Sequence, residues 1–147
     1  MSFRLYTIDN NYINYLKMYD SKVSHNYDHN VNKKPYVGIV YEDKDNHKFF
    51  APLSSPKERH KRMSDFMVDC IKLDEGKLGV INLNNMIPVN YSFLNSIIIP
   101  SEDERENFSK NEKEYIDLLV DQLKTINSAP TQKKIKRNAN KMFNKQV

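Results

Sequence analysis

Residues 36–53 are YVGIVYEDKDNHKFFAPL, two β-rich runs on either side of a polar segment. The runs at 36–41 and 48–53 hold β-branched and aromatic residues, which strands favour. The segment between them, EDKDNH, has the polarity and the length of a hairpin connection. The sequence therefore predicts that these two runs pair as a β-hairpin.

Shorter β-rich runs lie on both sides of this hairpin. Strands are expected at residues 3–7, 66–73, 78–83, 87–89 and 97–99. Between the first of these and the hairpin, residues 20–35 contain few apolar side chains and end in a proline, which predicts a long loop. Long loops are uncommon inside compact domains and often carry function.

Helical periodicity occurs in three places. One helix is expected after a cap at Asp9 or Asn10, and a second, with an apolar stripe and a capping box, spans Lys110–Ile126. A break at 128–130 precedes a third helix that Thr131 caps. Together these elements predict an α+β fold, a twisted and mainly antiparallel sheet with peripheral helices at one side, two of them C-terminal.

Composition narrows the class of protein. With 147 residues and 39% hydrophobic residues, the chain is expected to form a single domain, 1–147, with one core. Cys70 is the only cysteine, which excludes an internal disulfide and fits a reducing cytoplasm. No apolar run is long enough to span a membrane, and residues 1–6 lack the apolar stretch followed by small residues that is typical of a secretory signal. Only three glycines are present, so a glycine-rich nucleotide loop is not expected.

Positive charge is concentrated near the end of the chain. The net charge is only +4, but residues 131–147 hold six basic residues and no acidic ones. Such a patch suits a polyanion. A solvated helix face explains the same pattern, and charge alone does not choose between the two.

The segment Ser54-Ser55-Pro56-Lys57 directly follows the second hairpin strand. Pro56 suits the first position of a short helix, because its missing N–H is not needed there. Free N–H groups at such a junction, two hydroxyls and one ammonium group would favour a phosphate. An ordinary helix cap with a solvated lysine is the alternative, and the motif is short.

Two further lysines, Lys33 and Lys34, end the long loop just before the hairpin. If the hairpin forms, Lys34 and Lys57 lie at the same end of the sheet. Two ammonium groups that converge repel each other unless an anion lies between them, so this geometry favours a phosphate site. Exposed loop lysines are the alternative explanation.

The four histidines, His25, His29, His47 and His60, are candidates for acid–base chemistry. None shows a companion at a spacing typical of a zinc or magnesium site, and no carboxylate cluster is typical of a two-metal nuclease, so no metal site is expected. All four are expected at the surface. His60 is a minor candidate because it follows Lys57 by three positions.

Seven stretches, in order, carry a family resemblance. They are FRLYTI (3–8), YINYLKMYDSKV (12–23), KPYVGIV (34–40), FFAPLSSPK (49–57), INLNNMIPV (81–89), LLVDQLKTIN (118–127) and IKRNANKMF (135–143). In this order they resemble the ToxN/AbiQ family of type III toxins, endoribonucleases that a repeated, folded RNA antitoxin holds inactive. Each stretch is weak alone, but the ordered set spans nearly the whole chain.

The resemblance implies a sheet related to the MazF/Kid-like toxins and cleavage of adenine-rich RNA without a metal or other cofactor. Attack by the 2′-OH would leave a 2′,3′-cyclic phosphate and a 5′-OH. The resemblance also implies that the toxin processes its pseudoknotted RNA antitoxin, assembles with the repeats into a closed complex, and acts in abortive infection by phage. Cellular or phage RNA would be the substrate; neither DNA nor a membrane is expected as a partner.

Matching the family motif residue by residue places the catalytic groups at Ser54, Ser55, Lys57 and Lys34. One departure is clear: some members have an active-site tyrosine four residues before the loop lysine, where this chain has Asn30. Tyr27 is the candidate replacement. The general base is not assigned.

The basic residues predict an RNA-binding groove, with strong salt dependence. Its expected members are Lys33, Tyr27, Lys61, Lys133, Lys134, Lys136, Arg137 and Lys141, with Tyr91 as a further stacking candidate. Two alternatives stay open: a MazF-like RNase neutralised by a protein antitoxin, and a non-catalytic RNA-binding module.

Overall fold

The structure is a computed structural model that describes residues 2–20, 23, 27–28 and 32–146. Its strands are β1 (Arg4–Ile8), β2 (Tyr27–Asp28), β3 (Asn32–Lys33), β4 (Tyr36–Glu42), β5 (Lys48–Ser54), β6 (Cys70–Lys72), β7 (Val80–Asn82), β8 (Ile87–Pro88) and β9 (Leu94–Ser96). Its helices are α1 (Asn10–Tyr19), α2 (Glu58–Arg62), α3 (Lys110–Ile126) and α4 (Ala129–Gln146). Three short 3₁₀ turns, η1 (Asp74–Gly76), η2 (Leu83–Asn85) and η3 (Tyr91–Phe93), lie between strands.

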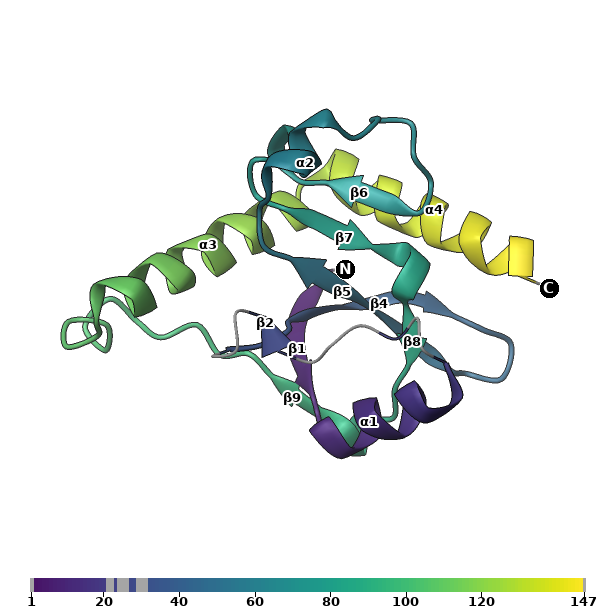
Figure 1. Cartoon of the computed structure of the whole chain (residues 1–147), viewed down its shortest axis with the longest axis horizontal. Coiled ribbons are helices and arrows are strands. Elements are labelled where there is room, and N and C mark those ends of the chain that lie inside the picture. Colours follow the sequence, from purple (N-terminus) through teal and green to yellow (C-terminus); the bar gives the residue numbers. More distant parts are fainter. Residues whose placement is uncertain (1, 21–22, 24–26, 29–31, 147) are drawn as a thin grey trace.

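One antiparallel sheet organises the molecule, and Figure 1 shows it with the helices around it. The strand order is β6-β7-β5-β4-β1-β9, with β8 also paired to β5, while β2 and β3 form a separate pair. The predicted α+β class with a mainly antiparallel sheet is therefore confirmed. No helix of the described residues is long and apolar enough to cross a membrane.

The predicted hairpin forms the centre of this sheet. Tyr36 pairs with Pro52 and Val37 with Ala51 in an antiparallel register. Gly38 pairs with Phe50, and a Cβ at Gly38 would overlap the Phe50 ring, so only glycine fits there. The start of β4 and the end of β5 are almost entirely buried, which explains the near-continuous apolar sequence of both strands there.

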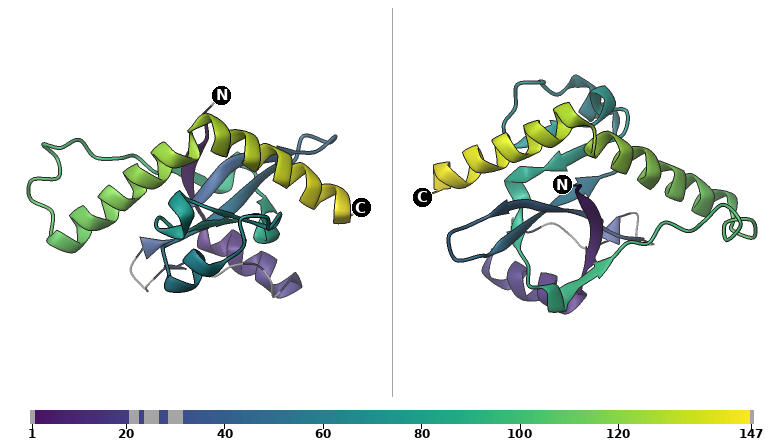
Figure 2. Two further views of the ribbon diagram at one scale, coloured as in Figure 1. Left: turned by 90° about the horizontal axis from the view of Figure 1, so that it is seen from above. Right: turned by 180° about the vertical axis from the view of Figure 1, so that it is seen from behind.

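The core lies on both faces of the sheet, because neighbouring residues of a strand point to opposite faces. Phe50 packs with Ile13 of α1 on one face, whereas Ala51 packs with Ile126 and Ile135 of α3 and α4 on the other. Figure 2 shows the strands between α1 and α4. The expectation that all helices lie at one side is therefore wrong: β4 and β5 are apolar on both faces and need cover on both.

Three predicted boundaries are also wrong. The run 66–73 forms a strand only at Cys70–Lys72, and Phe66 is 93% exposed. Residues 97–99 are not a strand, because only the N–H of Ile97 continues the pairing, to the carbonyl of Leu5, after β9. The last helix begins at Ala129 rather than after Thr131. Pro130 lies in its first turn, where a missing N–H costs no helical hydrogen bond.

The junction of α3 and α4 holds the first strand in place. The backbone N–H of Phe3 donates to Asn127 Oδ1 at 2.7 Å, and Asn127 Nδ2 donates back to the Phe3 carbonyl at 3.1 Å. Nearby, the buried Gln122 donates to the carbonyl of Leu78 at 2.8 Å. These side chains thus pair with backbone groups that lie just before β1 and β7.

Tyr36 offers a test of the core. It is fully buried, its hydroxyl has no hydrogen-bond partner among the described residues, and burial raises the pKa of the phenol above its ordinary range. A buried hydroxyl without a partner costs about 1–3 kcal/mol. We therefore expect Tyr36→Phe to raise the free energy of unfolding by about 1 kcal/mol, measured by urea denaturation.

Tyr12 provides the matched control, because its hydroxyl donates to the carbonyl of Pro88. Tyr12→Phe removes a hydrogen bond that is made, so it should lower the free energy of unfolding by about 1 kcal/mol. A Tyr36→Phe protein less stable than the unsubstituted protein would show that the Tyr36 hydroxyl does have a partner.

Candidate active site at the end of strand β5

The candidate site lies where β5 ends and the chain turns into α2. The N–H of Leu53 donates to the carbonyl of Pro35 at 2.9 Å, so the residues before β4 lie beside the end of β5. This places Lys34 and the segment 54–57 at the same end of the sheet, as the hairpin predicted. On the other side of β5, Ser54 pairs with Val80 of β7.

Ser54 is a buried hydroxyl held from behind. The residue is 5% exposed, and its Oγ accepts a hydrogen bond from Asn82 Nδ2 at 2.9 Å. Asn82 Oδ1 in turn accepts from the thiol of Cys70 at 3.3 Å. Because the Asn82 amide donates, the hydroxyl hydrogen of Ser54 can be donated to a further acceptor. Ser55, the next residue, is half-buried, and Lys57 is exposed.

Gly79, the residue just before β7, lies very close to Ser54. This glycine has φ of +97°, and a Cβ there would overlap the carbonyl oxygen of Ser54. Only glycine adopts such a φ without strain and also leaves room for the neighbouring backbone. The position of Ser54 therefore depends on a residue 25 positions away in the chain.

Lys57 and His60 form a closed pair of hydrogen bonds. The N–H of Lys57 donates to His60 Nδ1 at 3.1 Å, and the N–H of His60 donates to the carbonyl of Lys57 at 3.0 Å. The helix α2 begins only at Glu58, so the expectation that Pro56 opens it is wrong. One N–H expected to face a phosphate is instead taken by the imidazole.

His60 is 1% exposed, so its predicted place at the surface is wrong. Burial lowers the pKa of its imidazole, and the positive charges of Arg59, Lys57 and Lys34 lower it further. The ring is therefore neutral at pH 7, which matches its role as an acceptor at Nδ1. His47 is exposed as predicted, while His25 and His29 lie outside the described residues.

Three cations lie close enough to one buried imidazole to lower its pKa. Lys34, Lys57 and Arg59 come from the approach to β4, the end of β5 and the first turn of α2. Arg59 also acts on Cys70, whose thiol pKa is raised by burial and by Asp69 but lowered by Arg59. The carboxylate of Glu58 forms an ion pair with Lys61, with Glu58 Oε1 3.3 Å from Lys61 Nζ. The charge at this end of the sheet suits an anion.

Three residues of this site were not found from the sequence as site residues. Arg59 and Asn82 did not stand out, and His60 was only a minor candidate. For His60 and Arg59 the signal was closeness in sequence to Lys57. For Asn82 there was none, because its contact with Ser54 depends on the pairing of β5 with β7.

The predicted RNA-binding residues are spread more widely than one groove. Lys61 is exposed and paired with Glu58. Lys33 lies in β3, opposite Tyr27 of β2. The side chain of Tyr27 and all of Asn30 lie outside the described part of the chain, so the replacement of the family tyrosine stays a prediction. Tyr91 is 59% exposed, with Lys48 Nζ 5.3 Å from its ring centre.

The cations of α4 lie on both sides of its buried residues, which include Ile135 and Ala139. On one side a cavity of about 270 Å³ faces residues 65–68, and Lys134 Nζ donates to the carbonyl of Asp65 at 3.1 Å. The α4 cations that line it are Lys134, Arg137 and Lys141. On the other side, Lys136 lines a cavity of about 630 Å³ against β1 and β4, and Lys133 is exposed.

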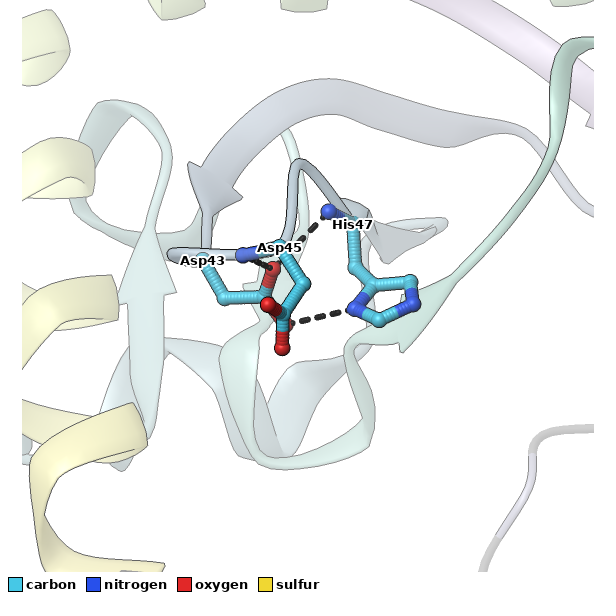
Figure 3. A group of neighbouring side chains, drawn as sticks. All are labelled: Asp43, Asp45 and His47. Carbon is cyan, nitrogen blue, oxygen red and sulfur yellow. Dashed lines mark hydrogen bonds and ion pairs between the residues drawn. The ribbon is translucent and has the colours of Figure 1, made fainter.

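A separate polar cluster lies at the far end of the hairpin, in the β4–β5 connection. Asp43, Asp45 and His47 have ligand atoms within 4.8 Å of one another, with His47 Nδ1 2.8 Å from Asp43 Oδ2 (Figure 3). Sequence spacing missed this companion of His47. Asp43 Oδ1 also accepts from the N–H groups of Asp45 and His47, so the cluster closes the turn.

Comparison with known proteins identifies the family of this chain. Residues 4–147 match the family model described as Toxin ToxN, type III toxin–antitoxin system. The endoribonuclease ToxN of Pectobacterium atrosepticum is 42% identical over 92 residues, which cover 58% of this chain and 53% of that protein. The endoribonuclease AbiQ of Lactococcus lactis subsp. lactis is 33% identical over 125 residues, covering 79% and 66%. The matches thus span about half to two thirds of these relatives.

Solved structures extend the similarity to the whole fold. One comes from a structure described with the words "A processed non-coding RNA regulates a bacterial antiviral system". Its chain matches with a TM-score of 0.78 at 33% identity, and the match covers 98% of this chain and 85% of that chain. The structure of AbiQ, described as a lactococcal anti-phage endoribonuclease, has a TM-score of 0.76 at 25% identity and covers 99% and 82%. With its family model matched over almost every residue, this chain belongs to the ToxN family of type III toxin–antitoxin toxins.

Proposed function

We propose that this protein is an endoribonuclease that cleaves RNA at the end of β5, using Ser54, Ser55, Lys57 and Lys34. The observation that carries this proposal is the hydrogen bond from Leu53 to Pro35, which brings Lys34 and Lys57 to one end of the sheet beside the buried residue Ser54. The charges of Lys34, Lys57 and Arg59 all act on His60 there. Such a site suits a phosphodiester, which is negatively charged and gains charge in the transition state. Two relatives are named endoribonucleases.

The proposed reaction needs no metal. The 2′-OH of the RNA loses its proton as its oxygen bonds to the adjacent phosphorus. The bond from phosphorus to the 5′-oxygen breaks and that oxygen takes up a proton, which leaves a 2′,3′-cyclic phosphate and a 5′-OH. Lys57 and Lys34 stabilise the charge on the phosphoryl oxygens, and the serine hydroxyls donate hydrogen bonds to them. His60 is not the base in this state, because Nδ1 is engaged and the neutral ring carries its proton on Nε2.

The proposed partners are two kinds of RNA. Cellular or phage RNA, preferably adenine-rich, is the substrate. A repeated RNA encoded with the toxin is the inhibitor. The toxin processes this RNA and forms a closed complex with its repeats in the cytoplasm. Phosphate contacts from Lys33, Lys61 and the α4 cations would give steep salt dependence. A structure of a relative is described as selective toxin inhibition by a non-coding RNA pseudoknot.

We expect RNA cleavage to continue undiminished in EDTA, because lysines supply the positive charge that a metal would otherwise bring. The assay incubates purified protein with an adenine-rich RNA and maps the product ends. A 2′,3′-cyclic phosphate at one end and a 5′-OH at the other is the expected outcome. Activity that EDTA removes and Mg²⁺ restores would contradict the proposed mechanism.

The same incubation separates the two alternatives. A non-catalytic RNA-binding module would bind the RNA and leave it whole. An RNase neutralised by a protein would cut it, but an RNA made from a tandem repeat beside the gene would not inhibit the cut. Inhibition by that RNA is the result that the type III assignment expects.

A further inference from the structure

We propose that His60 is a positioning residue for Lys57: its Nδ1 holds the backbone N–H of Lys57 and so fixes the direction in which the lysine leaves the turn between β5 and α2. This inference rests on the proposed role of Lys57 in RNA cleavage. His60 itself is buried behind the site and is not placed among the groups that touch RNA.

The geometry of the turn supports this role. The two hydrogen bonds between Lys57 and His60, at 3.1 and 3.0 Å, close a small ring at the start of α2. α2 has only five residues, far below the length at which a helix is stable alone. The direction of Lys57 therefore depends on what fixes this ring, and the imidazole is its one side-chain member.

The turn closed by the two hydrogen bonds also packs against η1. Gly76 of η1 has φ of +92°, and a Cβ there would lie 2.6 Å from the carbonyl oxygen of His60. Backbone therefore packs on backbone at this point, and α2 is fixed against η1. Of the two residues in the ring of hydrogen bonds, His60 is buried and Lys57 is exposed.

The contact needs an unprotonated Nδ1, and the surroundings keep it so. Burial lowers the pKa of His60, and Arg59, Lys57 and Lys34 lower it further. The other element packed on α2, η1, contributes Asp74 and Glu75, which are both exposed. The hydrogen bond is therefore intact at neutral pH and is lost only as the pH falls through the folded-state pKa.

This has a consequence for stability with a definite sign. The unfolded chain takes up a proton on this histidine near the ordinary value of 6.5, whereas the folded protein does so only at lower pH. The contribution of His60 to stability is therefore complete above pH 6.5 and decreases as the pH falls from there to the folded-state pKa.

Three substitutions distinguish the two ring nitrogens. Asparagine presents Oδ1 where histidine presents Nδ1, glutamine reaches the position of Nε2, and leucine fills the space without an acceptor. We expect His60→Leu to lower kcat/KM for RNA cleavage by about 10–100-fold, the effect of misplacing a catalytic group by about 1 Å. His60→Asn should recover most of that loss, and His60→Gln should not. Circular dichroism confirms that each variant is folded at the assay temperature.

Two readouts remain if the leucine variant does not fold. The kcat/KM of the unsubstituted protein should fall on the acid side as His60 protonates, and His60→Asn should lack that fall. In a ¹⁵N-labelled protein, the backbone amide signal of Lys57 should shift with the same midpoint as the imidazole of His60.

Several results would overturn the proposal. Equal losses in His60→Asn and His60→Leu would mean that His60 transfers a proton itself, and full activity in His60→Leu would mean that it positions nothing. If the unsubstituted protein cuts no RNA, the proposed function fails. The amide titration still tests the hydrogen bond between Lys57 and His60 on its own. If the Lys57 amide signal does not shift as His60 is protonated, this hydrogen bond is absent.

Discussion

Lys57→Ala is expected to slow RNA cleavage by about 10²–10³-fold, the usual cost of removing one group that stabilises transition-state charge. Lys57 is exposed at the end of β5, in the same charged cluster as Lys34 and Arg59. Its ammonium group is therefore available to a phosphate that approaches this end of the sheet. The loss should appear in single-turnover cleavage of an adenine-rich RNA, because that measurement isolates the chemical step.

The control for this experiment is another exposed lysine of the same hairpin. Lys44 lies in the β4–β5 connection, at the opposite end from Lys57, so Lys44→Ala removes the same charge from the chain and should leave the cleavage rate unchanged. Ser54→Ala should also slow cleavage, since it removes the hydroxyl beside the cations. A folded Lys57→Ala protein that cuts RNA at the native rate would remove this site from consideration.

Gly79→Ala is expected to lower the free energy of unfolding by about 2–4 kcal/mol, the sum of backbone strain and overpacking. The substitution forces an alanine to a φ of +97° and drives its Cβ into the carbonyl oxygen of Ser54. Because that carbonyl belongs to the last residue of β5, the damage should reach the site as well. We therefore expect the cleavage rate to fall together with stability.

Lys77→Ala is the matched control, because Lys77 is exposed and lies two residues before Gly79. Surface substitutions of this kind change stability by less than about 0.5 kcal/mol. Urea denaturation of the two variants measures the difference. A Gly79→Ala protein as stable as Lys77→Ala would show that β7 does not pack against Ser54 as closely as the structure has it.

The parts of the fold that sequence predicted are those with a local signal. The β4–β5 hairpin follows from two β-rich runs and a short polar connection, and α3 from its apolar stripe and its cap at Ser109. Lys34 and Lys57 were placed together by the same reasoning, because hairpin partners have a fixed relation. The family resemblance then assigned a catalytic role to some of these local features, and that assignment stays a prediction.

What sequence did not predict depends on contacts between distant residues. The burial of His60 arises because α2 packs against η1, and the hydrogen bond from Asn82 to Ser54 requires β7 to pair with β5. Neither pairing has a signature in the residues themselves. A histidine in a short, charged segment such as ERHKR looks exposed until its neighbour in space is known.

The two hydrogen bonds between Phe3 and Asn127 also affect how the protein folds. They close a loop of 124 positions, inside which every residue of the candidate site lies. Closing a loop costs more entropy as it lengthens, and proteins dominated by distant contacts fold slowly. The β4–β5 and β6–β7 hairpins join near neighbours, so we infer that a folding chain reaches them first. Docking of the α3–α4 junction onto β1 then becomes the slowest step, after most strands around the candidate site are already paired.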